Sequence, residues 1–286
     1  MPVRASALGQ ELTPRTVDVT ARMTLAFAAG IGDTGPRTFD DAGAEALVAP
    51  PSFCARLEWA VLGGDRAARL GLESDESIRG VHVEQDSMFH RPIRPGDRLT
   101  TLARIVAIRG TSAGALVQTQ LRTVTAATEE PVTTSWHTAI YRGVAAEGEG
   151  GRVDDPPPNP APPASLPGLQ TIHVPREAAH VYTECAGIWN PIHSERRVAL
   201  GAGLPDVILH GTATWAYAGR EIVRSYGDGD PTRLLRLRAR FRAPVIPGCD
   251  VSLLHGPGQA RGDVFFRVSI RRGDDALTDG YARLDG

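Results

Sequence analysis

Alternating hydrophobic and polar residues dominate the chain and predict strands. In residues 233–242 apolar side chains alternate with arginines: the apolar residues are Leu235, Leu237, Ala239 and Phe241, and the arginines are Arg236, Arg238, Arg240 and Arg242. A period of two is typical of a half-buried antiparallel strand. Similar patterns, separated by turns that contain glycine, predict strands at Asp97–Arg109, Ala115–Thr125, Val132–Tyr141, Val264–Arg271 and Leu277–Leu284.

Two longer segments favour helices instead. Ser52–Leu62 and Thr212–Tyr226 are the two segments for which we predict helices. Each half of the chain would therefore consist of a mostly antiparallel sheet with one long helix laid on it. The sequence predicts the α+β fold class.

A proline-rich segment divides the chain. Residues 143–168 combine prolines with glycine and acidic residues, a composition that favours a semi-rigid, extended linker. It separates a domain at residues 1–142 from a domain at residues 169–286. The two halves show the same order of features: a small-residue helix, a turn with glycine and proline, a longer helix, and two strands joined by Pro-Gly. This order indicates an internal duplication.

Composition narrows the chemistry. The 286 residues include 31 basic and 33 acidic side chains, a net charge of -2, which gives no electrostatic case for nucleic acid or an anionic membrane. No apolar run reaches the length of a membrane span, and the first residues lack the apolar core of a signal peptide, so a cytoplasmic location is expected.

All basic residues are Arg, which excludes a Schiff-base lysine. Three isolated cysteines and scattered histidines predict no disulfide framework and no metal site.

Residues 187–211 carry the strongest candidate chemistry. The Asn190-Pro191 pair predicts a rigid bend, from which His193 would project into a cleft. Histidine titrates near neutrality and suits proton transfer beside a thioester carbonyl. His210 and Gly211 directly precede a predicted helix, so the Gly211 amide is one of the unpaired donors at a helix start and suits a developing oxyanion.

This segment resembles the MaoC-like (R)-specific enoyl-CoA hydratases and 3-hydroxyacyl-thioester dehydratases. The matching residues are Gly187, Asn190, Pro191, His193, Ala199, Gly203, Ile208, His210 and Gly211. With its linker and repeated halves, the chain is similar to the fused double-hotdog members. The resemblance implies two antiparallel sheets, each wrapping a long central helix, and a degenerate N-terminal domain. It further implies a hydro-lyase acting on (3R)-hydroxyacyl or trans-2-enoyl thioesters of CoA or acyl carrier protein.

The resemblance also implies roles for individual residues. His193 would be the acid/base, the Gly211 N–H the oxyanion donor, and Asn190 the residue that fixes the bend. Trp189, Ile188 and His210 are expected near the substrate. CoA or phosphopantetheine would enter only as part of the substrate, with no separate cofactor. A homodimer or a heteromeric partner is a further possibility.

One departure from the family pattern affects the reaction. The family's catalytic Asp is replaced by Ile188, whereas in the N-terminal half Asp33 stands at the Asp position, with Gly35 and Thr38 in place of Asn and His. Asp without His in one half and His without Asp in the other gives the hypothesis of a composite site. The alternative is a degenerate N-terminal half that only shapes the acyl tunnel.

Three other functions stay open. Ile188 favours a non-catalytic thioester-binding or heteromeric partner subunit, and also an isomerase or cyclase that needs no second acid to hold water. A hotdog thioesterase would need a helix carboxylate, for which the chain offers Glu221 or Glu58. The arginine stripe of residues 236–242 either meets phosphates of CoA or a carrier protein, or forms a solvated sheet face.

Overall fold

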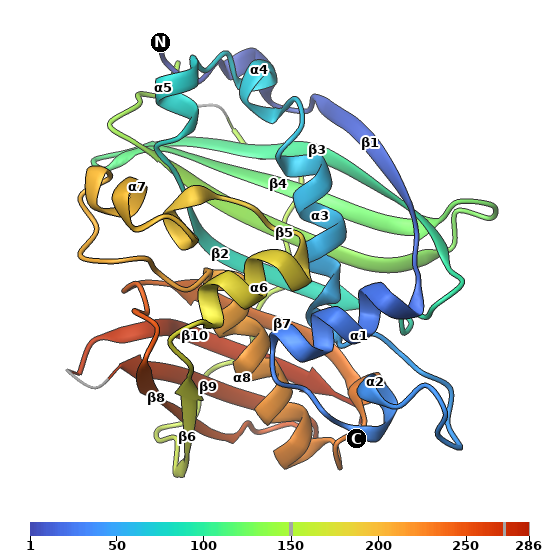
Figure 1. Cartoon of the computed structure of the whole chain (residues 1–286). Coiled ribbons are helices and arrows are strands. Elements are labelled where there is room, and N and C mark those ends of the chain that lie inside the picture. Colours follow the sequence, from blue (N-terminus) through green and yellow to red (C-terminus); the bar gives the residue numbers. More distant parts are fainter. Residues whose placement is uncertain (149–150, 271–272, 286) are drawn as a thin grey trace. The chain divides into compact units, whose positions relative to one another are not determined.

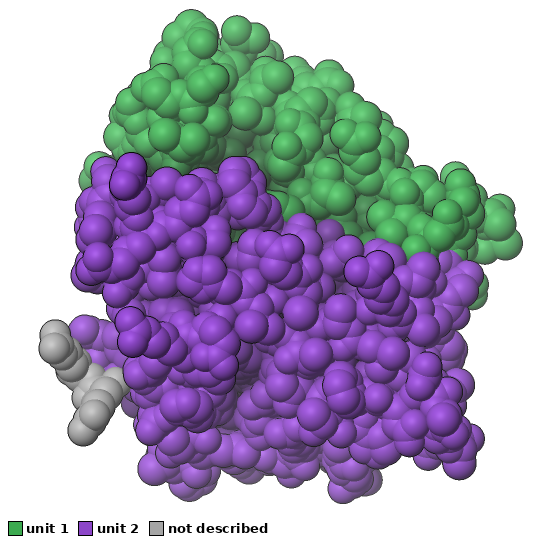
Figure 2. Space-filling view, in the orientation of Figure 1, with its two compact units in different colours: residues 1–18, 57–90, 98–158 green, residues 19–56, 91–97, 159–286 purple. Residues whose placement is uncertain are grey.

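Two compact units make up the computed structural model, which describes residues 1–148, 151–270 and 273–285 (Figure 2). Unit 1 comprises residues 1–18, 57–90 and 98–158, and unit 2 comprises residues 19–56, 91–97 and 159–286. This grouping by contacts is not linear in sequence, and the linear domains predicted at residues 1–142 and 169–286 stay a prediction. Glu149 and Gly150 of the predicted linker, Arg271 of a predicted strand, Arg272 and Gly286 lie outside the described residues.

Unit 1 contains one antiparallel sheet (Figure 1). Its strands are β1 (Glu11–Asp18), β2 (Gly80–Phe89), β3 (Arg98–Thr111), β4 (Gly114–Thr125) and β5 (Pro131–Arg142), in the order β1-β3-β4-β5-β2. The long hairpins place Leu121 opposite Ala103, and Leu102 opposite Arg122 on the other face. The alternation along the sequence therefore becomes one core face and one outer face.

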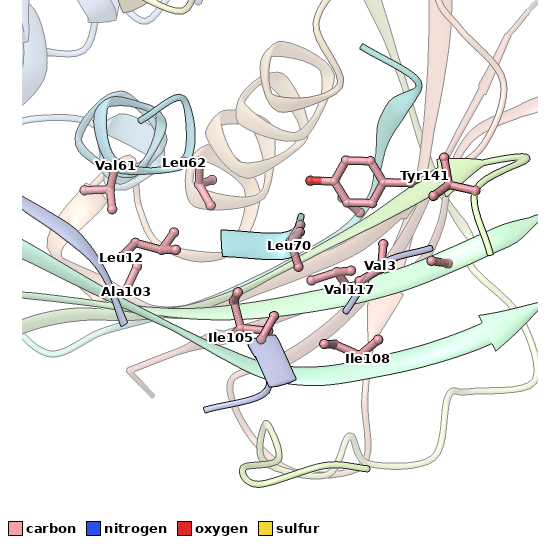
Figure 3. Packing of buried hydrophobic residues seen from close by; sticks show 14 of the residues in the cluster. Val3, Leu12, Val61, Leu62, Leu70, Ala103, Ile105, Ile108, Val117 and Tyr141 are labelled. Carbon is pink, nitrogen blue, oxygen red and sulfur yellow. The ribbon is translucent and has the colours of Figure 1, made fainter. Parts of the chain in front are cut away.

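The core face of unit 1 is covered by short helices. They are the later part of α3 (Cys54–Leu62) and α4 (Arg66–Leu70), whose Val61, Leu62 and Leu70 belong to the core; α5 (Ser74–Ser77) follows and has no buried residue. Val61 and Leu62 of α3 point toward apolar strand side chains, among them Ile105 and Val117 (Figure 3). All four are buried, so this contact removes a continuous apolar surface from water.

The start of the predicted linker packs on the sheet of unit 1 rather than standing free. The Val153 N–H donates to the Val106 carbonyl (2.9 Å), and the Arg152 guanidinium donates to Gln118 Oε1 (2.9 Å). Gln120 in turn donates to Asp154 (2.7 Å). This segment satisfies polar groups of β3 and β4 that would otherwise face solvent.

Unit 2 contains five more antiparallel strands. Its strands are β6 (Gly168–Val174), β7 (Leu234–Phe241), β8 (Cys249–Pro257), β9 (Asp263–Ile270) and β10 (Asp275–Leu284), in the order β7-β10-β9-β8-β6. Its helices are α1 (Ala21–Gly30), α2 (Pro36–Phe39), α6 (Ala178–Ala186), α7 (Arg196–Gly201) and α8 (Gly211–Tyr226). Figure 1 shows α8 running across one face of these strands. Trp215 and Ile222 on its inner face are fully buried.

The predicted α+β class is confirmed, and so are both long helices. Strands occur where alternation predicted them, as β3, β4, β5, β7, β9 and β10. The strands β1 and β6 were not predicted. In β1 only Leu12 is buried, so an alternating pattern has no buried face to mark it.

The expected faces of β7 are wrong at two positions. Leu235 is 39% exposed, whereas Arg236 is 7% exposed and lies over the Tyr281 ring, 5.5 Å from its centroid. Pairing with β10 shifts register between Leu234 and Arg236, which leaves Leu235 as the extra residue of a bulge. A bulge reverses the order of faces that strict alternation predicts.

Two leucines on neighbouring strands test the assignment of core and outer face. Leu121 is 1% exposed in the core of unit 1, and Leu102 is 39% exposed on the opposite face. We expect Leu121→Ala to reduce the free energy of unfolding by about 2–5 kcal/mol, because it leaves a cavity, and Leu102→Ala by less than about 1 kcal/mol. Guanidinium unfolding measures both. Equal losses would contradict the assignment.

Candidate active site

A glycine turns the chain from α6 into the motif segment. Gly187 ends α6 in the left-handed region, with a φ of 63°. A Cβ at this position would lie 2.7 Å from Nη1 of Arg56, and the same guanidinium donates to the Cys185 carbonyl at the end of the helix (3.2 Å). Both the backbone conformation and the close arginine therefore favour glycine here.

Asn190 and Pro191 build the bend that the sequence predicts. Asn190 is extended, with φ -150° and ψ 125°, and Pro191 begins a 3-10 turn at Pro191–His193. The Asn190 side chain accepts a hydrogen bond from the Ile192 N–H (3.3 Å), and its carbonyl accepts from the His193 N–H (3.0 Å). Asn190 thus caps the turn that carries His193.

A backbone carbonyl fixes the proton on the His193 ring. His193 Nδ1 lies 2.7 Å from the Ile208 carbonyl oxygen. A carbonyl can only accept, so Nδ1 carries the hydrogen and Nε2 keeps its lone pair. Burial lowers the pKa of His193 to about 4, although the bond to Ile208 acts in the opposite direction. His193 is therefore a neutral base near pH 7.

His210 supports His193 from the start of α8. The two rings stack with centroids 3.7 Å apart, and His210 is 2% exposed. His210 Nε2 donates to the Ile188 carbonyl (3.0 Å), which ties the helix start to the motif segment. Burial, and secondly the nearby His193, lowers the pKa of His210 to about 3. Its Nδ1 has no hydrogen-bond partner among the described residues.

Gly211 supplies a free amide next to these rings. It is the first residue of α8, and in the described part of the chain its N–H makes no hydrogen bond. A Cβ on Gly211 would lie 3.1 Å from Phe241 Cδ1, so a larger residue would press on that ring. The helix start adds a partial positive charge in the same place. A neutral base and an oxyanion donor are thus held by adjacent backbone segments.

The three remaining predicted residues near this segment lie in different environments. Ile188 is 4% exposed and reaches the site through its carbonyl, whereas the Trp189 side chain is 61% exposed. Glu184, considered as a substitute acid, lies on the exposed face of α6. None of the three places a carboxylate against His193.

Asp33 lies in a different part of unit 2. Its carboxylate accepts from the Gly35 N–H (3.2 Å) and is 3.9 Å from Nη2 of Arg224, with which it lines a cavity beside α8. Among the described residues, no hydrogen bond or ion pair joins Asp33 to His193. The geometry thus favours a site within one half, and the composite site stays an untested hypothesis.

Both helix carboxylates that a thioesterase would need are engaged elsewhere. Glu221 is buried and accepts from Arg220 (2.6 Å), Arg224 (3.1 Å) and Gln170 (2.7 Å). Glu58 is buried in unit 1 and accepts from Gln85 (2.9 Å) and Ser135 (2.5 Å). These bonds weigh against either residue as a nucleophile or base.

The described residues offer neither a metal site nor a membrane-spanning helix. In this part of the chain no group of three or more His, Cys, Asp or Glu side chains lies close enough to hold a metal ion. No described helix combines the length and the apolar character needed to span a bilayer. His82 and His137 stack 3.9 Å apart, and Arg66 lies 3.2 Å from His137, which leaves no set of metal ligands.

Sequence reasoning missed three contributions to the site. Ile208 acts through its carbonyl, Phe241 through its ring against Gly211, and Arg56 through the end of α6. Ile208 was recognised as a motif residue, but a main-chain acceptor leaves no side-chain signal. Phe241 and Arg56 are brought to the site only by the fold.

The tautomer and pKa of His193 are directly measurable. We expect its ring to titrate in NMR spectra with a midpoint near pH 4, with the hydrogen on Nδ1 above that pH. The unfolded chain binds this proton near pH 6.5, so the contribution of His193 to stability is full above that pH and is lost as pH falls toward 4. A midpoint near 6.5 would contradict the buried geometry.

Comparisons with known proteins match both halves of the chain. Residues 6–135 match the model of the FAS1-like dehydratase domain region, and residues 159–255 match the MaoC-like domain. The 3-hydroxyacyl-thioester dehydratase Y of Mycobacterium tuberculosis is 27% identical over 96% of this chain and 94% of its own length.

Solved structures agree on the fold. A MaoC-like dehydratase from Phytophthora capsici has a TM-score of 0.86 and 22% identity, covering 98% of this chain and 96% of that one. A conserved Mycobacterium tuberculosis protein with a double hotdog fold has a TM-score of 0.60 and 16% identity, covering 96% of this chain and 95% of that one. With its FAS1-like and MaoC-like halves, the chain belongs to the MaoC-like dehydratase and hydratase family of double-hotdog proteins.

Proposed function

We propose that this protein is a cytoplasmic hydro-lyase that interconverts (3R)-hydroxyacyl and trans-2-enoyl thioesters of CoA or of an acyl carrier protein. The observation that carries the proposal is the pairing of a neutral His193, whose Nε2 is available as a base, with the unbonded Gly211 N–H. The relative named as a 3-hydroxyacyl-thioester dehydratase, similar along nearly the whole chain, supports the substrate class.

The geometry suits a proton transfer beside a thioester carbonyl. In the elimination direction His193 Nε2 takes a proton from C2 while the Gly211 N–H stabilises the negative charge on the thioester oxygen. The C3–O bond then breaks, and the proton held on Nε2 goes to the departing hydroxide, which leaves as water. Because Nδ1–H stays bound to Ile208, the transient imidazolium keeps its orientation.

Because Ile188 replaces the acid of the family pattern, the proposed reaction is expected to be slow. An isoleucine neither holds water nor accepts a proton, and the loss of one acid/base group typically costs about 10²–10⁴-fold in rate. His193 would therefore serve as base in one step and as acid in the next. We expect slow turnover relative to a site that has both groups.

Ile188 also favours a second candidate, a thioester-binding subunit without activity of its own. Its side chain is buried and has no acid or base, and its carbonyl accepts from His210. Such a protein would bind acyl thioesters and need a catalytic partner. An isomerase or cyclase on the same scaffold is the other form that the missing acid permits.

Hydration of crotonyl-CoA and longer trans-2-enoyl-CoAs tests the first proposal. We expect the wild type to turn over at least one chain length and His193→Ala to lose about 10²-fold or more of kcat. His173→Ala is the matched control, because His173 is an exposed histidine on β6, where it pairs with Asp250. No wild-type turnover with CoA or carrier-bound substrates, with binding retained, would favour the non-catalytic subunit.

Asp33→Ala decides between a single-half site and a composite one. We expect it to keep the hydration rate within about threefold of wild type, since no hydrogen bond or ion pair among the described residues joins Asp33 to His193. The same assay measures it, and circular dichroism checks the fold. A loss as large as that of His193→Ala would support the composite site.

Restoring the family acid gives a gain-of-function test. We expect Ile188→Asp to raise the hydration rate about tenfold or more, because the carboxylate can hold the water that adds to C3. Ile188→Asn is the matched control, since it has the same size as Asp but no acid. Both variants place a polar group at a 4% exposed position, so melting temperatures are compared first. Equal rates in both folded variants would show that the missing acid does not limit turnover.

A further inference from the structure

Unit 2 contains a cavity that the His193 group does not line. Its volume is about 200 Å³, and its walls are mostly apolar, with Ile31, Pro36, Ala216, Val223, Leu234 and Leu237 among them. The polar side chains of the lining are Asp33, Ser52, and Arg220 and Arg224 on the C-terminal half of α8. An apolar protein cavity of about 150 Å³ holds benzene, so this one has room for a chain of about six or seven heavy atoms.

In the internal repeat this cavity occupies the place of the His193 site. Asp33 and Thr38 correspond to Ile188 and His193, and the helix starts match in backbone geometry. Pro50 has φ -51° and ψ 139°, and His210 has φ -58° and ψ 136°.

The chemistry of the His193 site is missing at this second position. Pro51 stands where Gly211 would be and has no N–H to offer an oxyanion. Thr38 is 2% exposed and donates its hydroxyl hydrogen to the Gly35 carbonyl (3.2 Å), so it is no base. The cavity retains Asp33 but has neither a base nor a main-chain donor, so it suits binding of a ligand without turnover of a thioester.

Charges around the cavity balance. Glu221 accepts from both Arg220 and Arg224, and the second guanidinium lies near Asp33. Two carboxylates thus face two guanidiniums, which leaves no net charge for an ionic ligand. An anion would also be repelled by Asp33 at the wall.

The gap between Asp33 and Arg224 defines the polar group that fits. Asp33 Oδ1 and Arg224 Nη2 are 3.9 Å apart, beyond a direct hydrogen bond. A hydroxyl oxygen accepts from a guanidinium and donates to a carboxylate, so one hydroxyl satisfies both groups. A carboxylate ligand can only accept, and an ammonium can only donate.

We propose that this cavity is a second ligand site, which binds a short aliphatic chain bearing one neutral hydroxyl group. The hydroxyl lies between Asp33 and Arg224, and the chain lies against Ile31, Val223 and Leu237. The proposal goes beyond the thioester reaction and does not depend on it.

Binding of 1-hexanol to the full-length protein tests the site. We expect saturable binding in ligand-observed NMR and calorimetry, with hexanoate and hexylamine each binding about tenfold more weakly. Asp33→Asn keeps the acceptor for the Gly35 N–H but removes the negative charge. In this variant the affinity for hexanoate, relative to that for hexanol, should therefore rise about tenfold. His193→Ala lies outside the cavity and should bind hexanol like the wild type.

A cavity-filling variant locates the binding. Ala216 is 1% exposed and lines the cavity, so Ala216→Leu should abolish hexanol binding. Should this variant not fold, the comparison of hexanol and hexanoate in Asp33→Asn decides alone. No binding of hexanol to the wild type at about 20 mM, unchanged binding in folded Ala216→Leu, or hexanoate binding unaffected by Asp33→Asn would each overturn the proposal.

Discussion

The hydrogen bond between His193 Nδ1 and the Ile208 carbonyl is the interaction on which the candidate site depends. It sets the tautomer, orients the ring, and leaves Nε2 as the only basic nitrogen. The acceptor belongs to the segment that leads directly into α8, so the same stretch of backbone that fixes the base also positions the Gly211 amide. The backbone of this segment therefore sets the positions of both the His193 ring and the Gly211 N–H.

The two units satisfy their buried carboxyl groups with different donors. Glu58 in unit 1 is satisfied by neutral donors from Gln85 and Ser135, and Glu221 in unit 2 is satisfied mainly by guanidiniums. A buried carboxylate is stable only with such partners. Because both helix carboxylates are occupied in this way, histidine is the base that we propose for the MaoC-like site.

Much of this architecture could be predicted from the sequence, because strands with one buried face and a helix with an apolar face leave a periodic signal. The Asn-Pro-x-His segment was also visible, since its residue types are tied to a turn. The bulge that exposes Leu235 and the stack of His210 on His193 were not visible. Both arise from pairing between distant segments, and the bonds that set them use backbone atoms common to every residue.

The proline that begins the helical segment at Pro51–Phe53 has a consequence for the history of the duplicated fold. A side chain that is missing, such as the histidine that the family pattern has at the position of Thr38, can be introduced by a single substitution. A lost main-chain donor returns only when the proline itself is replaced, and that replacement confers no advantage until a base is also present. The N-terminal half therefore lacks a main-chain donor at this helix start for as long as Pro51 is present.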